Sequence, residues 1–330
     1  MKKSEKKVIL ITGAAGSVGK NLVKYYLGEG HVVRGLDHSE DGLFKLEKEL
    51  VEKENFRPLF GNIRDYQRMD EAMRGVDWVI HCAACKHVYI NEYNPLEAVQ
   101  TNVIGTDNVI KSAINRNVER VLLTSSDKAV NPSSTMGASK LLAERTIVAA
   151  NNITGGSNTI FSSVRFGNIL NSNGSVLEIF KQFIDQGLPI PITSTKMTRF
   201  FLTMEDAVKL CDFSIRNMIG GEIFVRSMGG SDILTLAKAY SGNDTIEYNE
   251  IGLKPGEKYY EDLITEAELE RTYIMSDYYV IVPEIYEFFK DEIKEKLKKY
   301  WDLPKMNEDV RSDTGTLTVE ELRNMIFEEN

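Results

Sequence analysis

Three side chains in one short stretch have the types and spacing needed to move protons. The stretch from Val121 to Lys140 opens with a run of apolar residues, which is typical of a buried parallel strand. Ser126, Asp127 and Lys128 follow where that strand is expected to end. A carboxylate and an amine side by side can serve as general acid and general base. The pattern therefore predicts a proton-transfer site at the carboxyl end of a strand, where open α/β folds bind ligands.

A helix is predicted directly after this strand. Pro132 and the hydroxyl residues that follow it are typical of a turn and a helix start, because Ser and Thr side chains cap the first turn. Met136 and Lys140 lie four residues apart, so they share one helix face and point back toward the strand end. Lys140 is therefore predicted to join Asp127 and Lys128 at one site.

Structural alternatives exist for these residues. Asp127 and Lys128 could form an ion pair on a surface loop, and Lys140 could be an exposed helix lysine. Adjacent strand residues face opposite sides of a sheet, so a shared site requires the strand to end at this motif. The position of the pair at the end of the apolar run favours the functional interpretation.

A glycine-rich turn near the chain start indicates a phosphate-binding site. The apolar residues Val8–Thr12 predict a buried strand, and three glycines spaced three apart lead from it into a helix. Glycines let the backbone approach a pyrophosphate, and a helix N-terminus offers free N–H groups and a favourable dipole. The structural alternative is a tight strand–helix turn. The residues of this turn and helix start that are predicted to contact the dinucleotide are Gly13, Gly16, Ser17, Val18 and Gly19.

The second predicted strand, residues 31–37, ends at Asp37. A carboxylate there accepts a hydrogen bond from a ribose 2′-hydroxyl and repels a 2′-phosphate, so NAD is predicted as the cofactor. Arg34 and His38 lie close by in sequence, so NADP stays as an alternative, and His38 is included among the cofactor contacts. A solvated loop carboxylate is the structural alternative for Asp37.

Further cofactor contacts are predicted after later strands. The adenine would lie at the end of a strand over residues 56–60, and two alanines would let the cofactor lie against backbone. Lys86 could contact a phosphate or sugar oxygen, or be an exposed lysine. Asn102 is a poor helix former within a predicted helix, so it could order the site. These contacts are Asn62, Ile63, Ala83, Ala84, Lys86, Asn102 and Ser125.

Strands and helices alternate through residue 150, which predicts an α/β fold with a Rossmann-type doubly wound parallel sheet. A smaller C-terminal substrate-binding lobe is expected to be interleaved with it. Residues 1–168 and 198–240 are assigned to the dinucleotide-binding domain, and residues 169–197 and 241–330 to the lobe. We also expect one long helix over residues 94–117 and an amphipathic surface helix over residues 284–301.

Polar residues in and around the expected lobe are candidate substrate contacts. The loop after residue 166 is rich in amides and glycine, and Arg199 offers a fork of donors that could bind a diphosphate. A loop over residues 252–258, shaped by two glycines and a proline, supplies two more candidates. The predicted substrate contacts are Lys86, Asn168, Ser175, Arg199, Lys254 and Glu257.

Composition limits the class of protein. The 330 residues are 42% hydrophobic and 27% charged, as in an ordinary globular protein, and the net charge of −9 argues against nucleic-acid or membrane partners. No apolar run could span a bilayer, and the basic start lacks the apolar segment of a secretory signal. Three cysteines fit a reducing cytoplasm, which is the expected location. Cys82 and Cys85 could serve redox or metal chemistry, but without a second pair we predict buried packing and no metal.

Six motifs in this order resemble the extended short-chain dehydrogenase/reductases. They are GAAGSVG, SSDKA, M-x-x-x-K, RFGN, MTRFF and GLKPGEK. More narrowly, nearly the whole chain resembles the UDP-N-acetylglucosamine 4,6-dehydratases of surface-polysaccharide pathways. The resemblance implies a Rossmann domain with tightly held NAD(P), a smaller lobe that binds a UDP-sugar, and a homodimer or larger homo-oligomer.

The resemblance also implies a reaction in three steps. A hydride leaves C4 of the sugar for the cofactor, water is eliminated across C5 and C6, and the hydride returns to C6. It further implies that Asp127 and Lys128 supply acid and base for the elimination, and that Lys140 binds the nicotinamide ribose. One position departs from the usual pattern, because Met136 stands where Tyr-x-x-x-Lys has its tyrosine. A thioether cannot exchange a proton, although one branch of the dehydratases is similar here.

The protonation states need an explanation, because at neutral pH a free Asp is ionised and a free Lys is protonated. We hypothesise that Asp127 takes the C4 hydroxyl proton, directly or through Ser126, and then serves as the acid. Like-charge repulsion from Lys140 would favour the neutral amine of Lys128. Two rival functions remain. A nucleotide-sugar 4-epimerase needs no base at C5, and a non-catalytic dinucleotide-binding regulator would explain Met136.

Overall fold

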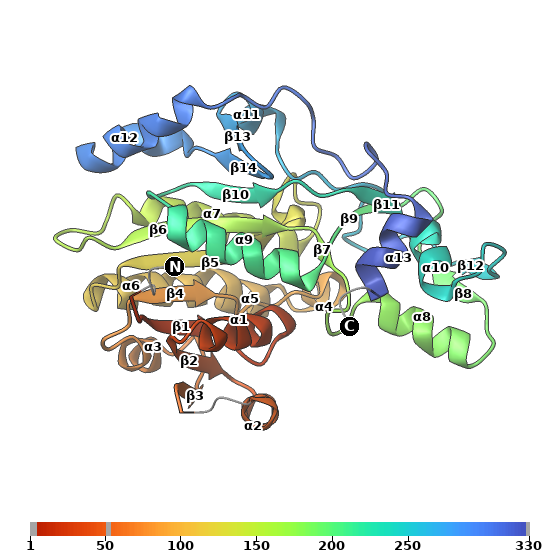
Figure 1. Ribbon diagram of the computed structural model, residues 1–330, viewed down its shortest axis with the longest axis horizontal. Helices are drawn as coiled ribbons and strands as arrows, with labels where there is room; N and C mark the ends of the chain where they lie inside the picture. The colour runs from red at the N-terminus through yellow and green to blue at the C-terminus, as the bar shows by residue number, and fades with distance from the viewer. Residues whose placement is uncertain (1–4, 51–53, 328–330) are drawn as a thin grey trace.

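A nine-stranded sheet forms the centre of the protein. The computed structural model describes residues 5–50 and 54–327, and Figure 1 shows the arrangement of its helices and strands. The strand order is β13-β14-β10-β6-β5-β4-β1-β2-β3. These strands are β1 (Val8–Thr12), β2 (Val32–Asp37), β3 (Phe56–Phe60), β4 (Trp78–His81), β5 (Arg120–Ser126), β6 (Ile160–Phe166), β10 (Ile223–Arg226), β13 (Thr272–Met275) and β14 (Tyr278–Ile281).

The strands from β3 to β10 pair in parallel throughout. Their order begins 3-2-1-4-5-6, as in doubly wound dinucleotide-binding folds. The predicted Rossmann-type α/β fold is therefore confirmed. Only the last two strands differ, since β14 pairs antiparallel with β10 and β13 pairs antiparallel with β14.

Helices cover both faces of the sheet (Figure 1). On one face, α1 (Ser17–Gly28) packs beside α9 (Met204–Asn217) over one apolar cluster. On the other face, α3 (Tyr66–Ala72), α6 (Gly105–Asn115) and α7 (Thr135–Ala150) lie side by side over a second cluster. Because both faces are covered, the central strands are nearly continuous apolar runs, which is why they could be predicted from the sequence.

A smaller lobe lies beside the sheet, at the right in Figure 1. It contains one three-stranded sheet of order β11-β9-β7 and one pair of strands, β12 and β8. Its helices enclose an apolar cluster separate from the two that cover the main sheet. Its elements are β7 (Asn168–Ile169), α8 (Val176–Asp185), β8 (Ile190–Ile192), β9 (Thr198–Leu202), β11 (Gly230–Asp232), α10 (Ile233–Ser241), β12 (Tyr248–Glu250) and α13 (Val319–Phe327).

The structure departs from the predicted domain division in two places. Residues 198–202 and 230–240, which were assigned to the dinucleotide-binding domain, contribute β9, β11 and most of α10 to the lobe. Residues 272–281, which were assigned to the lobe, form the β13–β14 hairpin that extends the main sheet. A hairpin carries no local signal of the sheet that it will join, because strand preference depends on cross-strand packing. The rest of the division stays a prediction, and residues 1–4, 51–53 and 328–330 within it lie outside the described residues.

The expected long helix over residues 94–117 is interrupted. It consists of α5 (Pro95–Ala98), a π-helical segment (Val99–Ile104) and α6. The π-helical segment contains the buried Asn102, whose side chain is bonded to a neighbouring loop. Such π turns occur mostly as local insertions at functional sites, and apolar periodicity does not reveal them.

The expected surface helix over residues 284–301 is also wrong. This segment forms a 3₁₀ turn (Glu284–Phe288), α12 (Asp291–Leu297) and a second 3₁₀ turn (Lys298–Asp302). Phe289, Leu297 and Tyr300 are buried in the core beneath the sheet edge, so the segment breaks to bring its aromatic rings inward.

A buried ion cluster joins the sheet to the C-terminal part of the chain. Arg165 of β6 donates to both carboxylate oxygens of Glu144 on α7 at 2.9–3.3 Å, and to those of Glu268 at 2.8 Å. Glu268 lies on the short α11 (Glu266–Leu269), which has a capping box. Burial alone would raise the pKa of Glu268, but the bonds from Arg165 outweigh it and lower that pKa to about 2.

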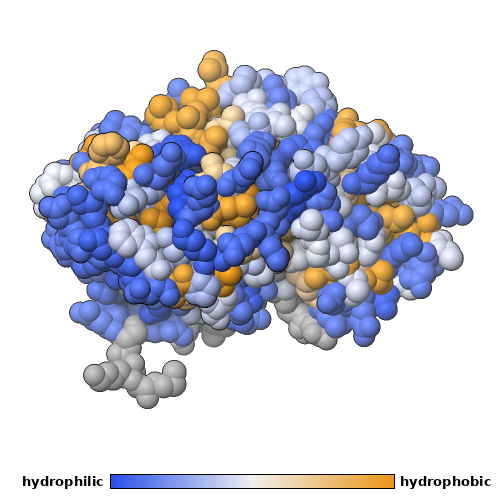
Figure 2. Space-filling model, turned by 90° about the horizontal axis from the view of Figure 1, so that it is seen from above, coloured by the Kyte–Doolittle hydropathy of each residue, from blue (hydrophilic) through white to orange (hydrophobic). Residues whose placement is uncertain are grey.

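Hydrophilic and hydrophobic side chains are interspersed on the face of the molecule that Figure 2 shows. Across residues 5–50 and 54–327, no helix combines the length and apolar character needed to cross a membrane.

Candidate active site

A cavity of about 1160 Å³ lies at the carboxyl ends of β1, β2, β4 and β5. This is where the sheet topology predicts ligand binding. Most of the predicted site residues line it, from both the cofactor and the substrate sets. Those that line it are Gly13, Gly16, Ser17, Val18, Gly19, Asp37, His38, Asn62, Ile63, Ala83, Ala84, Lys86, Ser125, Ser126, Lys128, Met136, Lys140, Asn168 and Ser175.

The glycine-rich turn between β1 and α1 is tightly closed. Gly13 has a φ of +68°, and a Cβ added at Gly19 would lie 2.1 Å from the Gly13 carbonyl oxygen. A side chain at Gly19 would push α1 away from the strand, and one at Gly13 would collide with the backbone of Cys82 and Ala83. The backbone N–H groups at the start of α1 therefore remain close to the cavity, as a bound pyrophosphate requires.

Asp37 ends β2 and is oriented by the backbone. Its Oδ2 accepts from the Ala15 N–H at 2.9 Å and its Oδ1 from the Ser39 N–H at 2.9 Å. His38 lies beside it, with 3.3 Å between His38 Nδ1 and Asp37 Oδ1, and is largely exposed. The carboxylate is thus fixed at the cavity wall before any ribose arrives.

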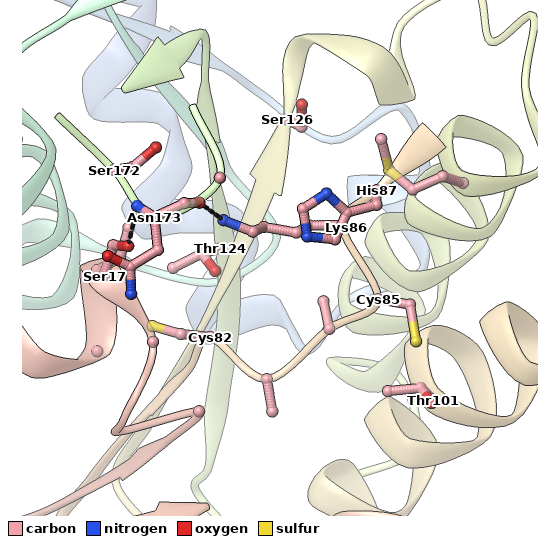
Figure 3. A pocket seen from close by; sticks show the side chains of 18 of the residues that line it. Ser17, Cys82, Cys85, Lys86, His87, Thr101, Thr124, Ser126, Ser172 and Asn173 are labelled. Atoms are coloured by element: carbon pink, nitrogen blue, oxygen red, sulfur yellow. Dashed lines mark hydrogen bonds between the residues drawn. The ribbon is translucent and has the colours of Figure 1, made fainter. Parts of the chain in front are cut away.

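The loop after β4 forms another wall of the cavity and contains the two closely spaced cysteines (Figure 3). We predicted buried packing for Cys82 and Cys85, but both are only partly buried and both line the cavity. Burial raises the pKa of the Cys82 thiol to about 12, so this thiol is not a nucleophile at neutral pH. The described residues contain no group of three or more His, Cys, Asp or Glu side chains that could bind a metal.

Lys86 and Ser17 contact the same residue across the cavity, as Figure 3 shows. Lys86 Nζ donates to the Asn173 carbonyl oxygen at 2.6 Å, and the Asn173 N–H donates to Ser17 Oγ at 2.9 Å. Asn173 was not among the predicted contacts, because its loop showed only a general richness in amides and glycine. The loop before α8 is therefore fastened to both the glycine-rich turn and the loop after β4.

Asn102 lies behind the cavity wall rather than in it. Its side chain exchanges two hydrogen bonds with the backbone of Cys85, at 2.8 and 3.1 Å, and donates to Ser139 Oγ at 2.9 Å. Asn102 is not among the residues that line the cavity, and its predicted contact with the cofactor stays a prediction. The predicted ordering role agrees with this placement, since Asn102 fixes the loop after β4 against α7.

Helix α7 brings Met136 and Lys140 to the strand end, as their spacing predicted. Its N-cap Ser134 accepts from the Gly137 N–H at 3.1 Å, and a Cβ at Gly137 would lie 2.3 Å from the Lys128 carbonyl oxygen. Lys140 Nζ donates to the carbonyl oxygen of Thr124, a residue that we did not single out, at 2.7 Å. Burial lowers the pKa of Lys140 to about 8.

The end of β5 holds a chain of polar contacts. Ser126 Oγ donates to Asp127 Oδ1 at 2.6 Å, and Lys128 Nζ donates to the same oxygen at 3.0 Å. Lys128 Nζ also donates to Asn168 Oδ1 at 3.0 Å. Asp127 is fully buried, and no group among the described residues donates to its Oδ2. Ser126 and Lys128 line the cavity, whereas Asp127 lies behind them.

A second cavity of about 160 Å³ adjoins the first, since Lys128 and Asn168 line both. Arg199 and Glu257, which were predicted to bind substrate, line this second cavity. Arg199 is buried and donates to the Thr198 carbonyl oxygen at 2.6 Å. Lys254 lines neither cavity, and its backbone N–H donates to Glu257. The structure thus divides the predicted substrate contacts between two adjoining spaces.

A parallel sheet of this order with a glycine-rich first turn is a dinucleotide-binding fold, and α7 brings Lys140 to the strand end with Met136 where extended short-chain dehydrogenase/reductases usually have a tyrosine. The resemblance noted from the sequence is confirmed by comparison with known proteins. The chain belongs to the polysaccharide biosynthesis protein family, whose model matches residues 9–283.

Two named relatives and one solved structure are similar to most of the chain. A UDP-N-acetylglucosamine 4,6-dehydratase (inverting) of Campylobacter jejuni is 41% identical over 281 residues, covering 84% of each chain. A UDP-glucose 4-epimerase of Rickettsia rickettsii is 36% identical, covering 83% of this chain and 82% of the relative. The X-ray structure of Pen from Bacillus thuringiensis is 38% identical, covers 98% of each chain and has a TM-score of 0.89. The chain thus falls in the class of nucleotide-sugar dehydratases and epimerases.

Proposed function

We propose that this protein removes water from a UDP-sugar, UDP-N-acetylglucosamine above all, to give a 4-keto-6-deoxy or 5,6-unsaturated product. The observation that carries the proposal is the bonded pair of Asp127 and Lys128 at the end of β5. A carboxylic acid and an amine in contact are what an elimination needs, and an epimerase has no use for a base at C5. The 4,6-dehydratase relative supports the same reaction and substrate.

The residues present fit a nicotinamide dinucleotide, with NAD favoured over NADP. The glycine cradle leaves no room for a Cβ and would receive the pyrophosphate, while Asp37 would accept from the ribose 2′-hydroxyl. The Ser125 hydroxyl lines the cavity, and its Oγ is buried without a partner among the described residues. When bound, the cofactor supplies a hydride acceptor and donor. Lys140, one turn from Met136, would bind its nicotinamide ribose.

Ser126 provides the route by which Asp127 would act. Asp127 lies behind the cavity wall, whereas the Ser126 hydroxyl lines the cavity and donates to Asp127 at 2.6 Å. A sugar C4 hydroxyl bonded to Ser126 would pass its proton through that hydroxyl to the carboxylate. This step replaces the tyrosine whose position Met136 occupies. The alternative route of direct transfer would require Asp127 to move toward the cavity.

Protonation of Asp127 would prepare both groups for the elimination. A C4 ketone makes the C5 hydrogen acidic, so the elimination then needs a base at C5 and an acid at the C6 hydroxyl. Asp127 would hold the proton taken from C4 and deliver it to the departing hydroxyl through Ser126. Loss of the carboxylate charge would remove an ion-pair partner of Lys128, so that its ammonium group would release one proton to solvent through the cavity and the neutral amine would then take the C5 proton. The C4 proton thus leaves with the water.

Arg199 would bind the diphosphate of the substrate from the second cavity, beside Glu257. We further propose that the protein works in the cytoplasm as a homodimer or larger homo-oligomer. The substrate class, a soluble nucleotide sugar, is the chemical reason for the location.

The decisive experiment incubates the purified protein with NAD and UDP-N-acetylglucosamine in D₂O and follows the product by mass spectrometry and NMR. A dehydratase gives a product that has lost one water and carries solvent deuterium at C5. Asp127→Asn should block both cofactor reduction and elimination, whereas Lys128→Ala should spare cofactor reduction and stop C5 exchange. Each loss should be about 10²–10⁴-fold, which is the usual contribution of one acid or base.

An isomeric product of unchanged mass would support the second candidate, a nucleotide-sugar 4-epimerase. The relative named UDP-glucose 4-epimerase gives that candidate its support. Absence of any product would favour the third, a non-catalytic dinucleotide-binding regulator. Cofactor reduction at the normal rate in Asp127→Asn would exclude the dual role of this carboxylate.

A further inference from the structure

Lys128 Nζ is held by two acceptors on different elements. Asp127 Oδ1 and Asn168 Oδ1 each lie 3.0 Å from it. An ammonium group has three donors and no acceptor, so the amide of Asn168 must present its oxygen. The Lys128 side chain lines both cavities and is about one fifth exposed. Two of its three directions are thus fixed by protein oxygens, and the third is available to a substrate.

Asn168 is placed by a rigid part of the fold. It begins β7, where it pairs with Phe201 of β9, and Phe201 is buried. The preceding Gly167 is so close to β9 that an added Cβ would lie 2.6 Å from Phe200 Cβ. A side chain on such a support stays within the small tolerance that a catalytic group requires.

The two bonds determine where the amine can accept a proton. A neutral amine keeps two N–H donors and one lone pair, arranged tetrahedrally around the nitrogen. If Asp127 and Asn168 each accept one N–H, the lone pair must point in the remaining direction, toward the cavities. With only one acceptor the amine could rotate about its last bond, and the lone pair would lose its orientation.

We propose that Asn168 is a positioning residue for Lys128, which aims the lone pair of its amine at the C5 hydrogen of the sugar. This inference rests on the proposed dehydration. It gives Asn168 a task different from the direct substrate contact predicted from the sequence. A neutral amide suits the task, because it accepts from the amine without adding a negative charge that would favour the ammonium form.

The test measures oxidation at C4 and proton removal at C5 separately in Asn168→Ala. The control is Asn249→Ala, which removes an exposed amide from β12. UDP-N-acetylglucosamine and NAD are the probes, and three quantities are measured: cofactor reduction, KM for the nucleotide sugar, and deuterium uptake at C5. Loss of orientation should lower C5 exchange by about 10²-fold, as misplacement of a reacting group does. Cofactor reduction and KM should change by less than about threefold, since the oxidation does not use Lys128.

Asn168→Asp provides a second test, the pH dependence of C5 exchange. A purely structural role of Asn168 would leave that pH dependence unchanged. A carboxylate at this position keeps an acceptor but favours the ammonium form of Lys128. The rising limb of C5 exchange against pH should therefore shift upward by about 1–3 pH units, with the maximum rate largely restored at high pH. The other charged side chains and the histidines around the two cavities do not differ between these variants; they are Asp37, His38, Arg64, Lys86, His87, Glu97, Lys140, Arg199, Glu257, Lys258 and Glu261.

The outcomes distinguish this inference from the proposed function. If the native protein neither reduces NAD nor exchanges C5, the proposed function fails first. If the native protein does both and Asn168→Ala exchanges C5 at the native rate, the positioning role is wrong. A rise in KM with equal losses in both half-reactions would instead assign Asn168 to substrate binding. Melting temperature and NAD binding of each variant, compared with Asn249→Ala, identify a variant that fails to fold.

Discussion

Two ionic clusters lie beside α7, and they differ in how completely their bonds are made. In the first, Arg165 lies between Glu144 and Glu268, and a bond to the Leu263 carbonyl oxygen completes its donors. In the second, Asp127 Oδ1 accepts two bonds, while its buried Oδ2 accepts none from the described residues. The first is closed to solvent, and the second faces the cavities through its neighbours.

The difference separates a structural cluster from a working one. A fully satisfied buried charge has one protonation state and one geometry, so it can join parts of a fold but cannot exchange protons. A carboxylate with one unpartnered oxygen keeps an acceptor that can take a further hydrogen bond or a proton. The Arg165 cluster thus fastens the C-terminal part to the sheet, and the Asp127 cluster keeps a proton acceptor in reserve.

Helix α7 connects the two clusters. Met136, Lys140 and Glu144 follow one another at intervals of four residues and are all buried. One end of this row lines the cavity, and the other end is bonded to Arg165. The Arg165 cluster can therefore fix the height of Lys140 relative to the strand end.

The largest effect on stability is expected from Arg165→Met. Removing the guanidinium leaves Glu144 buried without its ion-pair partner and Glu268 with only the 3.9 Å contact to Arg271, which costs about 3–5 kcal/mol of unfolding free energy. Urea unfolding measures the loss. Lys209→Met is a suitable control, since it removes only a half-exposed pair on α9 and should cost about 0.5 kcal/mol or less. A loss no larger than that of the control would contradict the structural role of the Arg165 cluster.

Much of the fold was predictable because burial on both faces leaves a strong sequence signal. The buried strand at Val8–Thr12 and the N-cap region of α7 lie where their residue types predicted them, and so does the edge strand at Phe56–Phe60, although most of it is not buried. The β13–β14 hairpin and the broken segment at residues 284–301 were missed. In both places the outcome depends on packing against distant residues, which local periodicity does not contain.

The candidate site shows the same limit. The glycine turn, Asp37 and the Met-x-x-x-Lys spacing placed their residues correctly in one cavity. The hydrogen bond from Lys86 to Asn173 joins residues that are 87 positions apart in the sequence. The bond from Lys128 to Asn168 joins residues that are 40 positions apart. No spacing rule reaches that far. Arg165 did leave a usable signal, because a charged residue within an apolar strand must have a buried partner.

A smaller effect, dependent on pH, is expected from Lys140 between the two clusters. Burial lowers its pKa to about 8 from the usual lysine value of 10.5, with Cys82, Glu144 and Cys85 acting in the opposite direction. Between these values the unfolded chain holds the proton and the folded chain does not. The contribution of Lys140 to the free energy of unfolding must therefore rise with pH between about pH 8 and pH 10.5.

The measurement compares the native chain with Lys140→Met by urea unfolding from pH 7 to pH 10. The difference in unfolding free energy should move in favour of the native chain above pH 8, by at most about 1.4 kcal/mol per pH unit. Subtracting the variant removes the titration of other groups. A difference independent of pH would show that Lys140 keeps its proton in the folded protein.

Asp127→Asn is expected to have the smallest effect on stability among these variants, although its effect on activity is large. Asp127→Asn removes a buried charge that is only half satisfied, while the amide oxygen can still accept from Ser126 and Lys128. Its unfolding free energy should therefore stay within about 1 kcal/mol of the native value, since functional sites retain groups that are not optimal for stability. Urea unfolding beside Arg165→Met compares the two clusters directly. If Asp127→Asn loses as much unfolding free energy as Arg165→Met, both clusters are structural. That result would contradict the proposed role of Asp127 in proton transfer.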